Sequence, residues 1–149
     1  MSRSLEDAVT GVYLKFKLQF YQRVFQRLES REASLSTVET FSVEVIDALG
    51  TPTISEFARF IGISVANATY KVQNLINKGY LRRERSEEDR RKSYLYVTER
   101  FHNYKSLHTN YIGTVAQRVE KTFSAEDVDT FRRILETISD ELMPEIKLS

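Results

Sequence analysis

A run of charged residues at positions 85–92 is the first place where the side-chain types suggest a chemistry. The segment RSEEDRRK is followed by SYLYV, in which tyrosine alternates with leucine and valine. This pattern predicts a hairpin tip that leads into a strand. At such a tip, the guanidinium groups of Arg85, Arg90 and Arg91 suit the narrow, electronegative minor groove of DNA. Asp89 precedes Arg91 by two residues and can hold its guanidinium through two hydrogen bonds, which would stabilise the wing. A solvated hairpin with weak surface ion pairs is the alternative.

A second set of polar side chains recurs at helical spacing between positions 64 and 78. At about 100° per residue, the apolar residues from Val65 to Ile76 fall on one side of a helix and an amide-rich face lies opposite. The residues expected to bind DNA from this face are Ser64, Asn67, Tyr70, Lys71 and Asn74, with Lys78 completing the face. Asparagine can bond adenine through two atoms, and lysine releases counterions from phosphates. A solvated amphipathic helix is the alternative.

The chain offers few groups for enzyme chemistry. It contains no cysteine, and its two histidines, His102 and His108, do not share a helix face and match no metal-binding pair. We find no glycine-rich phosphate loop and no nucleophile elbow. We therefore expect no catalytic residue, no metal site and no cofactor. A pair of carboxylates brought together only by the fold remains the enzymatic alternative.

Helical periodicity and capping residues define the elements that would position these groups. The spacing predicts a long, aromatic helix over 5–28, a helix from Ser36 to Gly50 with a Ser36/Glu39 capping box, and a short helix from Thr53 to Gly62. The polar helix follows from Ser64, and strands at 80–84 and 93–97 flank the charged tip. One more helix is predicted from Thr98 through Val119, and another from Ser124 to Leu142. The predicted fold is mainly α with a small β wing, as a winged helix-turn-helix with long terminal helices.

Composition and charge place limits on the class of protein. The chain has 149 residues, 41% hydrophobic and 29% charged, which suits one domain with a core. Its net charge is only +1, but positions 53–98 carry nine basic and five acidic residues, so this segment is +4 and the remainder −3. This asymmetry favours one basic functional face. No secretory pattern and no apolar run of about 20 residues is present, so we expect a cytoplasmic protein that does not span a membrane.

The segment TISEFARFIGISVANATYKVQNLINKGYLRRERSEEDRRKSYLYVTERF resembles the winged helix-turn-helix core of the MarR family of bacterial transcription regulators. The D-x-R signature of that family matches Asp89 and Arg91, followed by an alternating strand and Thr98. Its I-S-E-[LF]-A start matches residues 54–58, and its L-x-x-K-G-Y close matches residues 75–80. The likeness extends to the flanking helices. The family usually has glycine three residues after the threonine, where this chain has Phe101, so the packing at the start of that helix is where a departure is expected.

The resemblance implies one MarR-like domain over 1–149, with a winged core at about 36–98 and dimerisation helices at about 4–30 and 98–145. It also implies a homodimer that binds a pseudo-palindromic operator in double-stranded DNA as a ligand-responsive repressor, with a small lipophilic or aromatic effector. The long apolar helices support a dimer independently. A winged-helix protein-interaction module without DNA binding is the alternative. The sequence leaves open the operator, the regulated genes, the effector and the choice between repression and activation.

Overall fold

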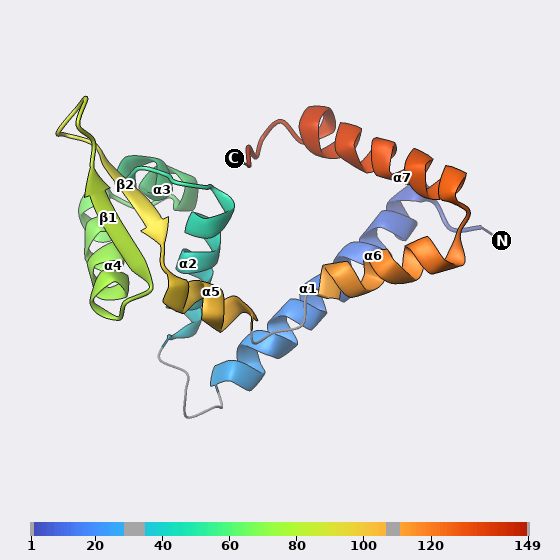
Figure 1. The fold of residues 1–149 in the computed structure, drawn as a ribbon, viewed down its shortest axis with the longest axis horizontal. Helices are drawn as coiled ribbons and strands as arrows, with labels where there is room; N and C mark the ends of the chain where they lie inside the picture. Colours follow the sequence, from blue (N-terminus) through green and yellow to red (C-terminus); the bar gives the residue numbers. More distant parts are fainter. Residues whose placement is uncertain (1, 29–34, 107–110, 149) are drawn as a thin grey trace. The chain divides into compact units, whose positions relative to one another are not determined.

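The structure is a computed structural model that describes residues 2–28, 35–106 and 111–148. It divides into two compact units (Figure 1). The helical unit comprises Met1–Gln26 and His108–Ile146, and the winged unit comprises Arg27–Leu107 with Lys147–Ser149. The short terminal helix α5 groups with the winged unit.

Three capped helices form the first half of the winged unit. They are α2 (Thr37–Ala48), α3 (Ile54–Ile61) and α4 (Val65–Asn77). The hydroxyl oxygens of Ser36, Thr53 and Ser64 accept the backbone N–H three residues later, and the Ser36/Glu39 capping box is complete. These bonds satisfy amide groups that have no partner within the helix. Gly62 has a φ of 75° and ends α3, which makes the tight turn between α3 and α4.

The hairpin that follows is the β wing. Strands β1 (Leu81–Arg85) and β2 (Ser93–Val97) are antiparallel, with Leu81 opposite Val97 and Arg85 opposite Ser93. Helix α5 (Glu99–Ser106) begins directly after β2. The expectation of a mainly helical fold with a small two-stranded wing is therefore confirmed.

One hydrophobic core joins the elements of the winged unit. Helices α2 and α3 pack against β2, and α4 packs against β1. The largest fully buried side chains are Phe57, Phe101, Ile46, Leu75, Leu95, Val43, Val72 and Pro52. They come from α2, α3, α4, β2, α5 and the loop before α3, so the helix-turn-helix and the wing share a single packed interior.

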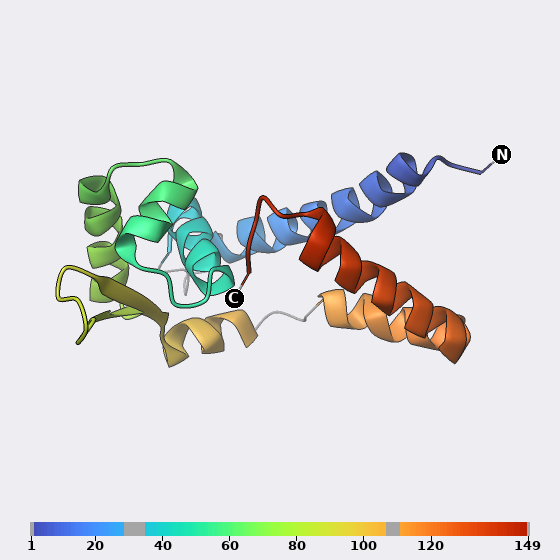
Figure 2. The same ribbon diagram turned by 90° about the horizontal axis from the view of Figure 1, so that it is seen from above.

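The helical unit buries far fewer of its apolar side chains than the winged unit does. It consists of α1 (Leu5–Leu28), α6 (Tyr111–Thr122) and α7 (Ala125–Thr137), and a π-helical turn (Ile138–Leu142) extends α7. Helices α6 and α7 meet at a turn and diverge from it (Figures 1 and 2). Phe16 of α1 meets Tyr111 of α6 edge to face, with ring centroids 5.7 Å apart. Neither α6, α7 nor the π-helical turn contains a buried residue, and Val24 is the one core residue of α1 among the described residues.

The observed bounds of the helices at both ends of the chain can be compared with the predicted ones. Helix α1 has the predicted bounds, and Ser124 caps α7 as expected, through a hydrogen bond from the N–H of Asp127. The single helix predicted from Thr98 through Val119 corresponds to α5 and α6. Residues 107–110, including His108, lie outside the described residues, so the predicted continuity there stays a prediction.

Candidate nucleic-acid interface

Helix α4 presents one apolar side to the core and one polar side to solvent. Ala68, Val72 and Leu75 are at most 1% exposed, which anchors the helix along its length. Asn67 is exposed, and Tyr70 keeps 69% of its surface accessible. Ser64 accepts the N–H of Asn67 at 3.1 Å, so the first turn of α4 is capped. The helix can therefore offer amide and phenol groups to a partner without disturbing its own packing.

The wing tip is organised around Asp89. Its Oδ1 atom accepts the backbone N–H of Arg91 at 3.0 Å and the Nε–H of the same residue at 3.1 Å, while Oδ2 lies 3.4 Å from Nη2. Ser86 Oγ accepts the N–H of Asp89, and the N–H of Lys92 donates to the carbonyl of Asp89. The contact that the sequence predicts between Asp89 and Arg91 is present. The side chain of Arg91 nevertheless remains 91% exposed, so its outer surface is free to meet a phosphate.

Backbone hydrogen bonds attach the wing to the helices. The N–H of Leu95 donates to the carbonyl of Pro52 at 2.8 Å, and Thr53 forms an isolated antiparallel bridge with Tyr94. Leu95 and Pro52 are fully buried. The start of α3 thus pairs with β2, so the wing and the helix-turn-helix hold a defined relation to each other.

Comparison with known proteins agrees with this geometry. Residues 35–93, which cover α2 through the wing tip, match the sequence profile of the MarR family. The winged helix-turn-helix of this chain is thus similar in sequence to the MarR family. Comparison with curated proteins gives no match.

Solved structures extend the MarR-family likeness to the fold of nearly the whole chain. Streptococcus pneumoniae FabT in complex with DNA is 21% identical with a TM-score of 0.62, and the match covers 96% of this chain and 100% of FabT. A MepR mutant from a multidrug-resistant clinical isolate of Staphylococcus aureus is 13% identical with a TM-score of 0.67, with the same coverage of 96% and 100%. Wild-type Escherichia coli MarR in its apo form is 16% identical with a TM-score of 0.51, covering 93% and 98%. The predicted MarR-like fold is therefore confirmed.

The polar face of helix α4 is turned relative to the predicted face. Lys71, Asn74 and Lys78, expected to point outward, are only half exposed, whereas Gln73 and Asn77 are exposed. The prediction counted Val65 and Thr69 with the apolar side, but Val65 is 52% exposed. Centring the apolar side on Ala68, Val72 and Leu75 alone would have found Gln73 and Asn77. The roles predicted for Lys71 and Asn74 in DNA binding stay predictions.

The half-exposed residues of α4 line a cavity against α2. It has a volume of about 300 Å³ and is lined by Ser36, Val38, Glu39, Ser42, Tyr70, Lys71, Asn74 and Leu75. Beside it, Nζ of Lys78 lies 2.8 Å from Oε1 of Glu39, an oxygen that also accepts the N–H of Ser36. An ion pair therefore connects the first turn of α2 with the end of α4.

Two carboxyl groups of the interface have lowered pKa values. Burial tends to raise the pKa of Glu39, but hydrogen bonds from Lys78 and Ser36 outweigh it and leave the pKa below its usual 4.5. The side-chain hydrogen bonds from Arg91 lower the pKa of Asp89, with help from its backbone N–H. Both carboxylates are therefore charged at neutral pH, and each holds its cation.

The C-terminal end of α4 is held by the start of α5. Nη1 of Arg100 donates to the carbonyl of Lys78 at 2.8 Å, and the hydroxyl of Thr98 donates to the carbonyl of Gly79 at 2.6 Å. The guanidinium of Arg100 lies over the ring of Tyr80, 4.8 Å from its centroid. Phe101, where the family usually has glycine, is fully buried in the core. The packing at the start of α5 therefore departs from the family pattern as expected, because a buried phenylalanine side chain attaches α5 to the core.

Within residues 2–28, 35–106 and 111–148, no group of three or more histidine, cysteine or acidic residues is arranged to hold a metal ion. In those same segments, no helix is both long and apolar enough to cross a bilayer.

Proposed function

We propose that this protein is a sequence-specific, DNA-binding transcriptional regulator that acts as a homodimer on a pseudo-palindromic operator. The exposed polar side of α4 carries this proposal, because it is displayed on a helix whose opposite side is fully packed. An exposed face that displays Asn67 and Tyr70 can reach base edges and phosphates in a major groove. FabT and MepR, two of the structural relatives, were solved with DNA and with an oligodeoxyribonucleotide.

The wing supplies the second part of the proposed interface. Arg85, Arg90 and Arg91 are exposed at or near its tip, and of these Arg91 is oriented by Asp89. An arginine that is already oriented loses less conformational entropy when it binds. We place these side chains at the minor groove that flanks the major groove occupied by α4. Asp89 is then the residue that stabilises the wing.

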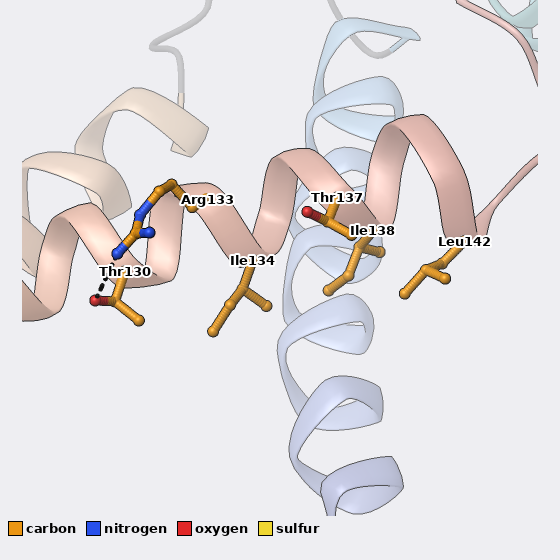
Figure 3. A pocket seen from close by; sticks show the side chains of 6 residues that line it. All are labelled: Thr130, Arg133, Ile134, Thr137, Ile138 and Leu142. Carbon is orange, nitrogen blue, oxygen red and sulfur yellow. Dashed lines mark hydrogen bonds between the residues drawn. The ribbon is translucent and has the colours of Figure 1, made fainter.

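The homodimer is supported by the apolar surface of the helical unit. Large side chains on its helices keep about half or more of their surface exposed, among them Leu5, Val12, Leu18, Ile112, Phe131, Ile134 and Leu142. A shallow cavity of about 280 Å³ on α7 is lined by Ile134, Ile138 and Leu142 together with Thr130, Arg133 and Thr137 (Figure 3). Exposed apolar side chains in this number favour an interface. We propose that a second copy of the chain covers them, and that the helices at about 4–30 and 98–145 serve dimerisation.

A ligand-responsive repressor is the finer form of the proposal. Its effector would be small and lipophilic or aromatic, in keeping with the apolar and aromatic side chains of the terminal helices. Native mass spectrometry of the purified dimer tests for a retained small molecule. Reporter expression with and without the protein separates repression from activation.

DNA binding itself is tested by titrating the protein against a random duplex library at several salt concentrations. A DNA-binding protein of this type loses affinity steeply as salt rises, because phosphate contacts release counterions. We expect that slope and an enriched pseudo-palindrome with half-sites about 10 base pairs apart. Binding to no duplex at low salt would instead favour a protein-interaction module.

A further inference from the structure

Two amide side chains on the exposed side of α4 are joined to each other. Nε2 of Gln73 donates a hydrogen bond to Oδ1 of Asn77 at 2.9 Å, one helical turn further on. Both residues are exposed. This is the one hydrogen bond that the structure records for either side-chain amide within the described part of the chain, so the rest of both groups is open to a partner.

The pair lies on the side of α4 that faces away from the core. Stepping about 100° per residue, Gln73 and Asn77 fall on the side opposite Ala68, Val72 and Leu75, next to the exposed Tyr70. Lys71 and Asn74, in contrast, turn toward α2. If α4 enters a major groove, Gln73 is therefore better placed to reach a base edge than the half-exposed Asn74.

The hydrogen bond leaves Gln73 with a defined pattern of donors and acceptors. One amide hydrogen is engaged by Asn77, so the carbonyl Oε1 and the second amide hydrogen remain. Adenine presents the complementary donor N6–H and acceptor N7 in the major groove, whereas guanine presents two acceptors, N7 and O6. An amide held in this orientation suits adenine. Opposite guanine, the acceptor Oε1 would face the acceptor O6, and two acceptors form no hydrogen bond.

We propose that Gln73 reads the adenine of an A·T pair in the major groove and that Asn77 is the positioning residue that fixes the orientation of its amide. The proposal rests on the DNA-binding function proposed above. Gln73 contacts the base, and Asn77 acts through Gln73. Because Asn77 can rotate its own amide and donate to Oε1 instead, its hold on the orientation is partial. A carboxylate at the same position can only accept, so it would hold the orientation fully.

The test measures base preference with the full-length protein. Duplexes selected from a random library by the wild type are compared with those selected by Gln73→Ala, Asn77→Ala and Asn77→Asp. Gln117→Ala is the matched control, because Gln117 is an exposed glutamine on α6, far along the chain from α4. Melting curves confirm that each variant is folded.

We expect the wild type to prefer adenine over guanine by roughly 5- to 150-fold at one position of each half-site, the discrimination typical of a bidentate contact. Gln73→Ala should abolish that preference, Asn77→Ala should weaken it, and Asn77→Asp should keep or sharpen it despite lower affinity for all sequences. Gln117→Ala should change nothing.

The outcomes separate this inference from the function on which it rests. If the wild type binds DNA but Gln73→Ala keeps every base preference, the reading role is wrong. If Gln73→Ala loses the preference but Asn77→Ala and Asn77→Asp behave alike, the positioning role is wrong. If the wild type binds no duplex at all, the proposed function fails and this inference fails with it.

Discussion

Nζ of Lys78 lies 2.8 Å from Oε1 of Glu39, and the same oxygen accepts the N–H of Ser36 at 3.0 Å. One carboxylate thus completes the cap of α2 and holds the residue that ends α4. The exposed polar side of α4 is the surface proposed to contact bases, which we call the reading face. Its position relative to α2 therefore depends in part on the charge of Glu39.

This ion pair predicts a pH-dependent contribution to stability. The folded-state pKa of Glu39 lies below its usual 4.5, so its contribution is complete above about pH 4.5 and is lost as the pH falls through the lowered value. At pH 7, Glu39→Gln should lower the melting midpoint by a few degrees, the shift that about 1 kcal/mol produces in a small protein. The difference between wild type and variant should shrink in acid. A difference that stays constant from pH 7 to pH 3 would show that the charge of Glu39 contributes nothing.

Removal of the wing arginines should weaken DNA binding without affecting the fold. Arg90→Ala and Arg91→Ala should each cost roughly 1 to 3 kcal/mol of operator affinity, because each removes a contact to DNA. Fluorescence anisotropy on a selected operator measures the loss. Arg118→Ala, at an exposed position of α6, is the control and should bind normally. Unchanged affinity in both wing variants would remove the wing from the interface.

Truncation of the core under α4 should act on stability instead. Leu75 is 1% exposed, so Leu75→Ala should destabilise the winged unit by roughly 2 to 5 kcal/mol through lost burial and a cavity. Phe60→Ala is the control for stability of this unit, because Phe60 of α3 is 47% exposed. Chemical denaturation followed by tyrosine fluorescence and circular dichroism measures both. An unchanged unfolding midpoint for Leu75→Ala would mean that α4 does not depend on this contact.

A charge introduced on the apolar side of α7 should separate the proposed dimer. Ile134→Asp and Ile138→Asp should each weaken association by roughly 30-fold or more, as expected for a central interface residue. Sedimentation velocity over a concentration series measures the change. Lys121→Asp places the same side chain at an exposed polar position of α6 and should leave the dimer intact. A wild type that remains monomeric at micromolar concentration would contradict the dimer itself.

Local features of the fold follow from the sequence alone. Ser36, Thr53, Ser64 and Ser124 each cap the helix predicted to follow them, because a capping hydroxyl acts on amides only a few residues away. The contact between Asp89 and Arg91 is equally local, since two residues of one turn must lie close together. Short-range chemistry of this kind needs no knowledge of the rest of the chain, and the MarR resemblance extended it to the whole winged unit.

The direction of the reading face was decided by tertiary packing. Periodicity placed Val65 and Thr69 among the apolar residues of α4 and so turned the predicted face toward Lys71 and Asn74. The rotation of a helix about its axis depends on which apolar side chains its neighbours cover. Helix α4 packs against α2, α3 and β1, and Val65 stays 52% exposed.

Long-range contacts at the ends of α4 and the wing were likewise outside the reach of the sequence. Such contacts join residues far apart in the chain. Examples are the hydrogen bonds from Arg100 and Thr98 to the end of α4 and the bridge between Thr53 and Tyr94. Phe101 is likewise buried in a core formed by distant elements. The spacing of apolar residues within one helix or strand carries no information about contacts between different elements. They arise when separate apolar faces close around one core, and that closure positions the proposed site.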